Sequence, residues 1–179
     1  GYSEQPLIRY ADLVSACSDP EVDAFLICTP NHTHTDVLKV AMRSGKPIFL
    51  EKPMATTLAD ADAIVKANDA YPSFIQIGLQ YRFKAQYLEA FHEVQQRQSV
   101  GVVKTISMSE YRPPFLDKVG QWNKFNQNSG GTLVEKCCHF FDLMVQVIPS
   151  KPTRVIASGG QDVNHLDEFY DGETPDIMD

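Results

Sequence analysis

The sequence predicts an α/β fold whose first part forms one half of a doubly wound parallel sheet. Three observations support this fold class. Short apolar runs alternate with segments of helical periodicity up to Gly78, in the order β-α-β-α-β. The connections between these segments are short, as they are in α/β units. Beyond Gly78 the pattern changes to longer amphipathic and loop-like segments, which indicates a second structural unit.

Three strands are expected in the first part, at residues 24–28, 48–50 and 74–78. Their continuous apolar character is typical of parallel strands covered on both faces, and it places Cys28 in the core. Proline follows each of the first two strands and ends it. Helices are expected at 35–44, where Gly45 provides a stop, and from Thr57 to about residue 70. Thr57 and Asp60 have the spacing of a capping box at the start of this second helix.

The second part begins with an amphipathic helix, expected at residues 84–98. Partial alternation predicts a strand at 102–111, and glycine and proline predict a loop at 112–131. A largely apolar segment at 132–148 indicates one buried helix, and 154–157 is expected to form another strand. The tail, residues 161–179, has seven acidic and no basic residues, so we expect an exposed loop or frayed terminus.

Composition excludes several classes of function. A formal net charge of −7 argues against binding to nucleic acids or anionic membranes, although a small neutral or anionic substrate in a local basic pocket is compatible with it. No apolar run approaches the roughly 20 residues that cross a bilayer, and the first residues lack the features of a secretory signal. The four cysteines show no C-x-x-C spacing, which indicates reduced thiols and a cytoplasmic protein.

Two loops that follow predicted strands contain candidate functional residues. They are Thr29-Pro30-Asn31-His32-Thr33-His34 and Glu51-Lys52-Pro53. Ligands of open α/β sheets bind outside the carboxyl ends of the strands, so both loops are expected to face one crevice. A lysine at that position is suited to moving a proton to or from a hydroxyl or carbonyl oxygen. The alternative is that Lys52 is a surface lysine beside a turn proline.

A second group of candidates lies in the predicted helix at 132–148. Glu135, His139 and Asp142 are spaced i, i+4, i+7 and would share one face of that helix. Titratable groups in apolar surroundings are costly unless they are paired or face a cavity, and a histidine oriented by a carboxylate suits proton transfer. Two alternatives are a hydrogen-bonded core pair of Glu135 and His139, and a zinc site of Glu135, Cys138 and His139. Zinc is the less favoured because adjacent side chains diverge and no fourth ligand is evident.

The sequence contains no G-x-G-x-x-G turn of the kind that binds a dinucleotide pyrophosphate. If residues 1–78 form the second half of a dinucleotide-binding sheet, the first half would need about 60–70 further residues, since one βαβ unit takes roughly 30. We therefore expect a chain that is incomplete at both ends.

Three motifs together resemble those of the Gfo/Idh/MocA family, which includes glucose–fructose oxidoreductase and inositol dehydrogenases. They are T-P-N-H-T-H after one strand, E-K-P after the next, and G-G-T-L-x-E-x-x-x-H-x-x-D from Gly130. The resemblance runs from about residue 9 to residue 157. It implies a partial Rossmann domain without its phosphate loop at residues 1–79. It also implies a partial C-terminal α+β domain at 80–179, with an open, mainly antiparallel sheet.

The same resemblance implies roles for individual residues. Lys52 would bind and polarise the substrate hydroxyl, His139 would transfer a proton, and Glu135 stands where many relatives carry an aspartate. Arg82, within Tyr81-Arg82-Phe83, would contact the substrate or be structural. The residues expected to line the cofactor are Thr29, Pro30, Asn31, His34, Glu51, Lys52 and Pro53.

The resemblance implies an oxidoreductase that uses NAD or NADP and transfers hydride to or from a sugar or cyclic polyol. This chain would be a fragment of it, and the protein would be a homo-oligomer through the C-terminal sheet. The alternative is a non-catalytic module, derived from the same fold, that binds a small molecule or supports oligomerisation. The sequence does not distinguish NAD from NADP, because it contains neither the glycine fingerprint nor the acidic residue that follows it.

Overall fold

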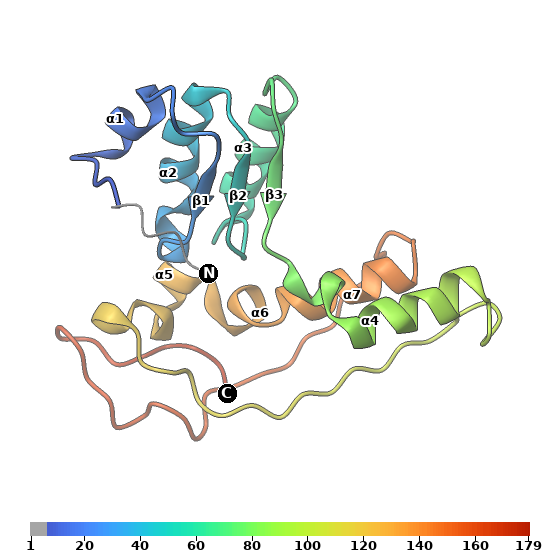
Figure 1. Cartoon of the computed structure of the whole chain (residues 1–179). Coiled ribbons are helices and arrows are strands. Elements are labelled where there is room, and N and C mark those ends of the chain that lie inside the picture. The colour runs from blue at the N-terminus through green and yellow to red at the C-terminus, as the bar shows by residue number, and fades with distance from the viewer. Residues whose placement is uncertain (1–6) are drawn as a thin grey trace.

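The computed structural model describes residues 7–179, and its first part contains a three-stranded parallel sheet (Figure 1). The strands are β1 (Phe25–Ile27), β2 (Ile48–Leu50) and β3 (Ile75–Ile77), in the order β1-β2-β3. Ile48 of β2 lies opposite Phe25 on one side and Ile75 on the other. Three helices accompany the sheet: α1 (Leu13–Ser18), α2 (His34–Ala41) and α3 (Leu58–Asn68). The predicted β-α-β-α-β order is confirmed.

Local sequence signals explain where these helices begin and end. Thr57 precedes α3, and its hydroxyl oxygen accepts a hydrogen bond from the backbone N–H of Asp60 at 3.1 Å. After α2 the chain continues through a 3₁₀ turn, Met42–Ser44, and stops at Gly45, whose φ of +67° is the left-handed conformation that glycine adopts easily. The predicted capping position and the predicted glycine stop are therefore both confirmed.

The core of the first part lies on one face of the sheet. Leu38 and Ala41 of α2 are fully buried, and they form a cluster with Ile64 of α3 and the inward-facing strand residues Ile27, Ile48 and Leu50. The prediction that the strands are covered on both faces is wrong for β1. Leu26 points away from the cluster and is 74% exposed, because no described element covers that face. Cys28, just after β1, is also exposed and is not part of the core.

The second part contains several short helices joined by long irregular segments. A 3₁₀ turn, Gln80–Phe83, leads from β3 into α4 (Ala85–Phe91), which continues as a π-helical turn, His92–Gln96. Further along are a kinked 3₁₀ segment, Val119–Lys124, then α5 (Asn126–Ser129), α6 (Gly131–Glu135) and α7 (Cys138–Val147). Among residues 7–179, no helix is both long and apolar enough to cross a bilayer. The division at residue 79 stays a prediction.

The segment 132–148 is not one helix, as the sequence indicated, because the chain turns between α6 and α7. In a continuous helix the carbonyl oxygen of Glu135 would accept from the backbone N–H of His139. It accepts instead from the Lys52 ammonium at 2.8 Å. Glu135 and His139 consequently belong to different helices, and the prediction that they share one helix face is wrong.

The two strands expected in the second part do not form. Residues 102–111 and 154–157 are extended but have no strand beside them in the described chain. Val102, Val155 and Ile156 are at least 77% exposed. Extended backbone becomes a strand only when a neighbouring strand pairs with its N–H and C=O groups. Sequence alternation alone therefore predicted two strands that the described chain does not contain. The second part contains one isolated antiparallel bridge among its described residues, between Tyr170 and Glu173.

The acidic tail, residues 161–179, is a largely exposed loop, as one of the two predicted alternatives has it, and is not frayed, because several contacts attach it to the rest of the second part. Ile177 is 1% exposed, and Thr132 donates a hydrogen bond to the carbonyl oxygen of Met178 at 2.6 Å. Lys124, 2% exposed, contacts Asp117 and Glu168 at 2.8 and 2.7 Å and Tyr170 at 3.2 Å. We call these four side chains the Lys124 network; it attaches the tail to the 3₁₀ segment before α5.

Candidate functional site

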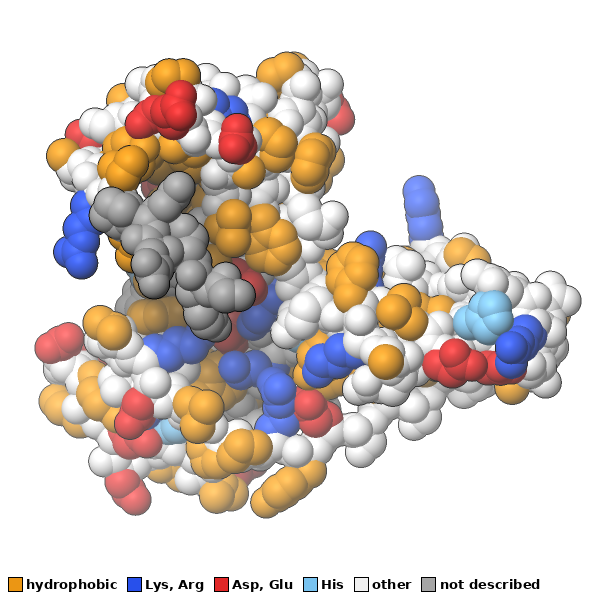
Figure 2. Space-filling view, viewed as in Figure 1, with side chains coloured by type: hydrophobic (Ala, Val, Ile, Leu, Met, Phe, Trp, Pro, Cys, Tyr) orange, Lys and Arg blue, Asp and Glu red, His pale blue; other side chains and the backbone are white. Residues whose placement is uncertain are grey.

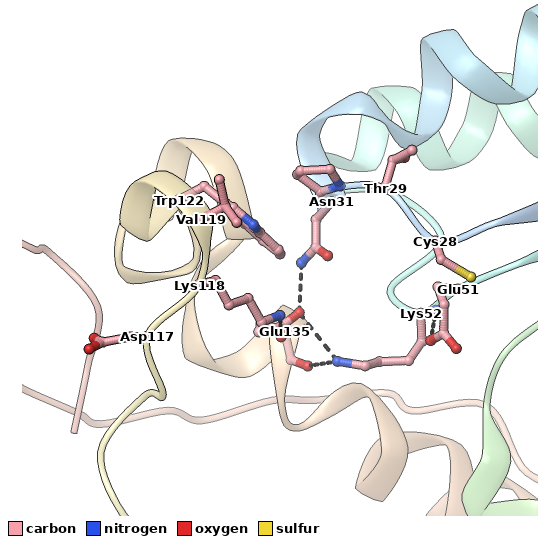
Figure 3. A pocket seen from close by; sticks show the side chains of 11 residues that line it. Cys28, Thr29, Asn31, Glu51, Lys52, Asp117, Lys118, Val119, Trp122 and Glu135 are labelled. Carbon is pink, nitrogen blue, oxygen red and sulfur yellow. Dashed lines mark hydrogen bonds and ion pairs between the residues drawn. The ribbon is translucent and has the colours of Figure 1, made fainter. Parts of the chain in front are cut away.

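An open cavity of about 850 Å³ lies where the carboxyl ends of β1 and β2 face the second part of the chain (Figure 3). Both predicted loops contribute to it, as expected from the topology of an open parallel sheet. The opposite wall comes from the 3₁₀ segment and from the end of α6. The cavity is lined by Cys28, Thr29, Pro30, Asn31, Glu51, Lys52, Asp117, Lys118, Val119, Trp122 and Glu135.

Lys52 extends from the end of β2 across the cavity to α6 (Figure 3). Its ammonium donates to the carbonyl oxygen of Glu135 at 2.8 Å and lies 3.3 Å from Oε2 of the same residue. The side chain is only 17% exposed. The alternative of a free surface lysine is therefore wrong: the structure fixes this ammonium at the meeting point of the two parts.

Glu135 is a fully buried carboxylate surrounded by donors. Asn31 donates to its Oε2 at 2.6 Å, and Lys118 and Lys136 lie 3.5 and 3.3 Å from its Oε1. Burial raises the pKa of Glu135, but the Asn31 hydrogen bond and the charges of Lys52, Lys136 and Lys118 outweigh it, so the net shift is downward. The carboxylate is therefore ionised near neutral pH.

Asn31 was expected to line the cofactor, and it does line the cavity. Its amide, however, points at the second part of the chain, where it donates both to Glu135 and to the backbone carbonyl of Ser129, the latter at 3.1 Å. Thr29, Pro30 and Glu51 also line the cavity, as the sequence predicted. The carboxylate of Glu51 accepts from the backbone N–H of Lys52 at 3.1 Å.

His34 and Pro53 were also expected beside the cofactor, but neither lines the cavity. The His34 ring is fully buried, with Nδ1 2.8 Å from the carbonyl oxygen of Pro53 and Nε2 3.0 Å from that of Thr29. The ring thus links the loop after β1 to the loop after β2. Its position at the start of α2 directs it into the interior, which explains the error.

His139 lies beside this site without lining the cavity. It is 5% exposed and stacks on Tyr81, with ring centroids 4.2 Å apart. Within the described chain its buried Nδ1 has no hydrogen-bond partner, so the alternative of a Glu135–His139 core pair is wrong. Burial, together with the charges of Lys52, Arg112 and Lys84, lowers the pKa of His139 to about 4. The imidazole is therefore neutral near pH 7.

Arg82 forms an ion pair with Asp142 of α7, with Nε 2.7 Å from Oδ2 and a second contact between Nη2 and Oδ1. The Asp142 hydrogen bond raises the pKa of Arg82 and keeps it charged. Arg82 does not line the cavity, so the geometry agrees with the structural alternative for this residue. Asp142, which the sequence grouped with Glu135 and His139, is directed to Arg82.

The sequence did not single out Lys118, Trp122 or Lys136, which the structure places at or next to the cavity. Lys118 and Trp122 lie in the segment 112–131, which glycine and proline marked only as a loop. The Lys118 ammonium lies 4.4 Å from the centroid of the Trp122 ring. The sequence signal that could have identified this part of the site is a lysine close to the only tryptophan of the chain.

Metal binding finds no geometric support among residues 7–179, where no group of three or more His, Cys, Asp or Glu side chains is placed to hold a metal ion. Cys138, part of the zinc alternative, has its Sγ 3.9 Å from the carbonyl oxygen of Glu135. All four cysteines are free thiols.

Comparisons with known proteins were made for both parts of the chain. Residues 4–79 match the model "Oxidoreductase family, NAD-binding Rossmann fold", and residues 95–173 match "Oxidoreductase family, C-terminal alpha/beta domain". An uncharacterised oxidoreductase, YrbE of Bacillus subtilis, is 28% identical over 87% of this chain and 43% of its own length. The myo-inositol 2-dehydrogenase of Thermotoga maritima is 26% identical over 84% of this chain and 43% of its own length.

Solved structures agree with these matches. The aldose–aldose oxidoreductase of Caulobacter crescentus, crystallised with glycerol, superposes with a TM-score of 0.68 at 27% identity. That match covers 83% of this chain and 44% of the other. The chain thus spans less than half the length of the relatives it matches. Both domain models, and the motifs around Lys52 and His139, agree: the chain belongs to the Gfo/Idh/MocA oxidoreductase family.

Proposed function

We propose that the full-length protein is an NAD(P)-dependent dehydrogenase that oxidises a CH–OH group of a sugar or cyclic polyol. The observation that carries this proposal is the position of Lys52. Its ammonium lies in the cavity at the carboxyl edge of the sheet, fixed by the main chain and the carboxylate of Glu135. Ligands bind at that edge in open α/β folds, and an oriented cation there suits an alcohol or carbonyl oxygen.

The residues present fit the nicotinamide end of a dinucleotide. The Glu51 carboxylate opens on the cavity at the end of β2 and would accept hydrogen bonds from ribose hydroxyl groups. Thr29 and Pro30 provide the wall after β1. The glycine-rich turn that binds a pyrophosphate is not in this sequence, so the phosphate groups would be held by other parts of the full-length protein.

Lys52 would bind the substrate oxygen. An ammonium group has three N–H donors, and here one is directed to the Glu135 carbonyl and one lies near its carboxylate. The third remains for a ligand in the cavity. A cation within hydrogen-bonding distance stabilises the alkoxide character that develops on the oxygen as the carbon–hydrogen bond breaks. Glu135 acts through Lys52 in this proposal, as the group that orients it.

His139 would accept the proton of the substrate hydroxyl. With a pKa of about 4 its imidazole is neutral near pH 7, which is the form that can accept a proton. Its Nδ1 has no partner among the described residues but is buried beside Tyr81, so this step requires the ring to turn towards the cavity. When bound, the dinucleotide supplies the acceptor for the two electrons and the hydrogen that leave the substrate carbon. The alcohol becomes a carbonyl group, and its O–H proton passes to the imidazole.

We also propose that the enzyme is cytoplasmic and forms a homo-oligomer. Free thiols support a reducing, cytoplasmic environment. The extended segments at 102–111 and 154–157, with exposed Val102, Val155 and Ile156, support assembly of identical subunits through this region. Light scattering of the full-length protein would measure the subunit number, and a monomer would contradict this part of the proposal.

The catalytic proposal is tested with Lys52 in the full-length protein. Production of NADH or NADPH is followed by absorbance with inositols and aldoses as substrates. The Lys52→Ala variant is expected to lose about 10²- to 10⁴-fold in kcat, the usual contribution of a positioned group of this kind. The exposed Lys66→Ala, on α3, serves as the matched control and should keep the wild-type rate. A Lys52→Ala enzyme with full activity would rule out this mechanism, and a protein that reduces neither dinucleotide would favour a non-catalytic module.

A further inference from the structure

Three lysines converge on the single carboxylate of Glu135. The Nζ atoms of Lys52, Lys118 and Lys136 lie 3.3, 3.5 and 3.3 Å from its oxygen atoms, and we call these residues the lysine cluster. One negative charge faces three positive charges, so the cluster has a local surplus of cations. Figure 2 shows Lys and Arg side chains gathered in the middle of one face, where the sheet part meets the rest of the molecule. This surplus contrasts with the net charge of −7 of the whole chain.

The surplus is concentrated at one oxygen atom. Lys118 and Lys136 both contact Oε1, whereas Oε2 is occupied by Asn31 and Lys52. Two ammonium groups that share one oxygen repel each other, and each keeps donors that Glu135 does not use. Burial lowers the pKa of Lys136, and the charges of Lys52 and Lys118 lower it further against the opposing effect of Glu135. An additional anion beside Oε1 would relieve this repulsion.

Neighbouring carboxylates do not supply that anion. Asp117 lines the cavity, but its Oδ1 is paired with Lys124 at 2.8 Å, and Figure 3 shows the side chain directed away from Glu135. Glu51 lies at the end of β2, where its Oε2 accepts from the backbone N–H of Lys52. The side of the cavity next to Lys118 therefore has an uncompensated positive charge.

The ammonium groups of Lys118 and Lys136 are accessible to a ligand. Lys118 lines the cavity and its side chain is 40% exposed, while that of Lys136 is 25% exposed. Both ammonium groups lie over aromatic rings, 4.4 Å from the centroid of Trp122 and 4.6 Å from that of Phe115. Cation–π contacts of this kind restrict where the two charges can move, so their positions are fixed before a ligand arrives.

We propose that the substrate of this site is an anionic sugar derivative, whose carboxylate or phosphate group lies against Lys118 and Lys136 while Lys52 holds the reacting oxygen. This inference rests on the proposed dehydrogenase function and narrows its substrate class. Lys118 and Lys136 act as binding residues in this role. Neutral inositols and aldoses would leave the surplus charge unpaired and would bind less tightly.

Trp122 allows binding to be measured without catalysis. It is the only tryptophan in this sequence and lines the cavity beside Lys118, so the part of the fluorescence change that a Trp122→Phe variant of the full-length protein lacks reports on ligands at this wall. The full-length protein is titrated, without dinucleotide, with D-glucose, D-glucuronate and D-glucose 6-phosphate at constant ionic strength. These probes share one ring, so differences among them isolate the anionic group and distinguish carboxylate from phosphate.

At least one anionic probe is expected to bind about tenfold or more tightly than glucose, the effect of one hydrogen bond between charged groups. The Lys118→Gln and Lys136→Gln variants should each remove most of that preference. Lys104→Gln, which removes an exposed lysine outside the site, should leave the preference unchanged. Circular dichroism of each variant verifies that it is folded.

Equal binding of glucose and both anionic probes would overturn the inference, as would a preference that survives both substitutions. ADP-ribose that binds more tightly than either anionic sugar, and depends on Lys118, would assign the cluster to dinucleotide phosphates and would also overturn it. The two proposals fail separately. Turnover of neutral sugars without an anion preference would leave the dehydrogenase standing, whereas lysine-dependent anion binding without any dinucleotide reduction would leave only the anion site.

Discussion

Glu135 is central to the site at the scale of single residues, because it connects side chains from three separate segments. A buried carboxylate is costly unless it is paired and hydrogen-bonded, and here Asn31 and the lysine cluster supply the compensation. The ionised form is consequently maintained in the interior. Removing one lysine leaves two, so single substitutions in the cluster should change ligand binding more than folding.

Sequence motifs predicted part of this arrangement. Lys52 and Glu135 were identified because each follows a recognisable pattern, a strand end and a glycine-rich helix start. Lys118 could not be identified in the same way, because its proximity to Glu135 depends on how residues 112–131 fold back on α6. Lys136 follows Glu135 directly in the sequence, but adjacent side chains of the continuous helix that was expected would diverge. Asn31 was placed at the cavity correctly, but its contact with Glu135 spans 104 residues of sequence and has no local signal.

The ionisation of His139 gives a prediction at this scale. Its pKa of about 4, against 6.5 for a free histidine, is due first to burial and next to the charge of Lys52. The Lys52→Met substitution should therefore raise the His139 pKa towards 6.5, and Lys104→Met should leave it unchanged. Titration of the imidazole protons by NMR measures both values. A wild-type value near 6.5 would contradict the burial on which the prediction rests.

The lowered pKa of His139 also makes the free energy of unfolding depend on pH. Between pH 6.5 and 4 the unfolded chain binds a proton at His139 and the folded chain does not, so stability falls as the pH is lowered through that range. The loss should reach about 3 kcal/mol, since one pKa unit corresponds to roughly 1.4 kcal/mol. Urea unfolding of the wild type and His139→Leu across this range measures the difference, which the variant should lack.

At the scale of elements, the tail depends on the Lys124 network. Burial opposes the charged form of Lys124, but the hydrogen bonds that it donates to Asp117 and Glu168 outweigh this effect and raise its pKa, so it is charged. Its hydrogen bond lowers the pKa of Glu168 to about 2. The stabilisation from Glu168 is present above its usual pKa of 4.5 and is lost as the pH falls towards 2.

Replacing Lys124 with methionine should detach the tail. The substitution leaves Asp117 and Glu168 without their cation, and we expect a loss of about 1–3 kcal/mol in the free energy of unfolding. Limited proteolysis should then cut within residues 161–179 sooner than in the wild type. Lys151→Met removes an exposed lysine and is the control. Unchanged cleavage in Lys124→Met would show that other contacts, such as that between Thr132 and Met178, suffice.

Elements with strong local signals were predicted well. The helical segment that starts with α2 stops at Gly45 and α3 begins after Thr57, as the sequence indicated, because these signals act over one turn of backbone. The break between α6 and α7 was not predictable, because it coincides with a hydrogen bond to Lys52 from a distant strand end. The strands expected at 102–111 and 154–157 required partners that local alternation does not specify.

At the scale of the whole molecule, the first part exposes an apolar sheet face. Leu26 on β1 is 74% exposed and Phe74, next to β3, is 61% exposed. The continuous apolar runs correctly indicated the strands, but they could not show that helices cover only one face of the sheet in this chain. Together with the unpaired segments of the second part, this surface predicts that the 179-residue chain self-associates.

Replacing Leu26 with threonine should reduce that self-association. Threonine introduces a β-branched side chain suited to a strand and removes apolar area from the exposed face, so folding should be little affected. Light scattering over a concentration series should show a lower apparent mass for Leu26→Thr than for the wild-type chain. Leu58→Thr, at an equally exposed position on α3, is the control and should behave as the wild type. Identical masses for all three chains would exclude the sheet face as the contact.

The hydrogen bond from Lys52 to the main-chain carbonyl of residue 135 has a consequence for substitutions at that position. A carbonyl group is the same whichever amino acid occupies the position, so the anchor of the lysine does not depend on the side chain there. Glutamate could thus be replaced by aspartate at this position without loss of that anchor, while the shorter carboxylate would reach less far towards Lys118 and Lys136. A change at position 135 would therefore alter the charge that a ligand meets in the cavity while Lys52 stays in place.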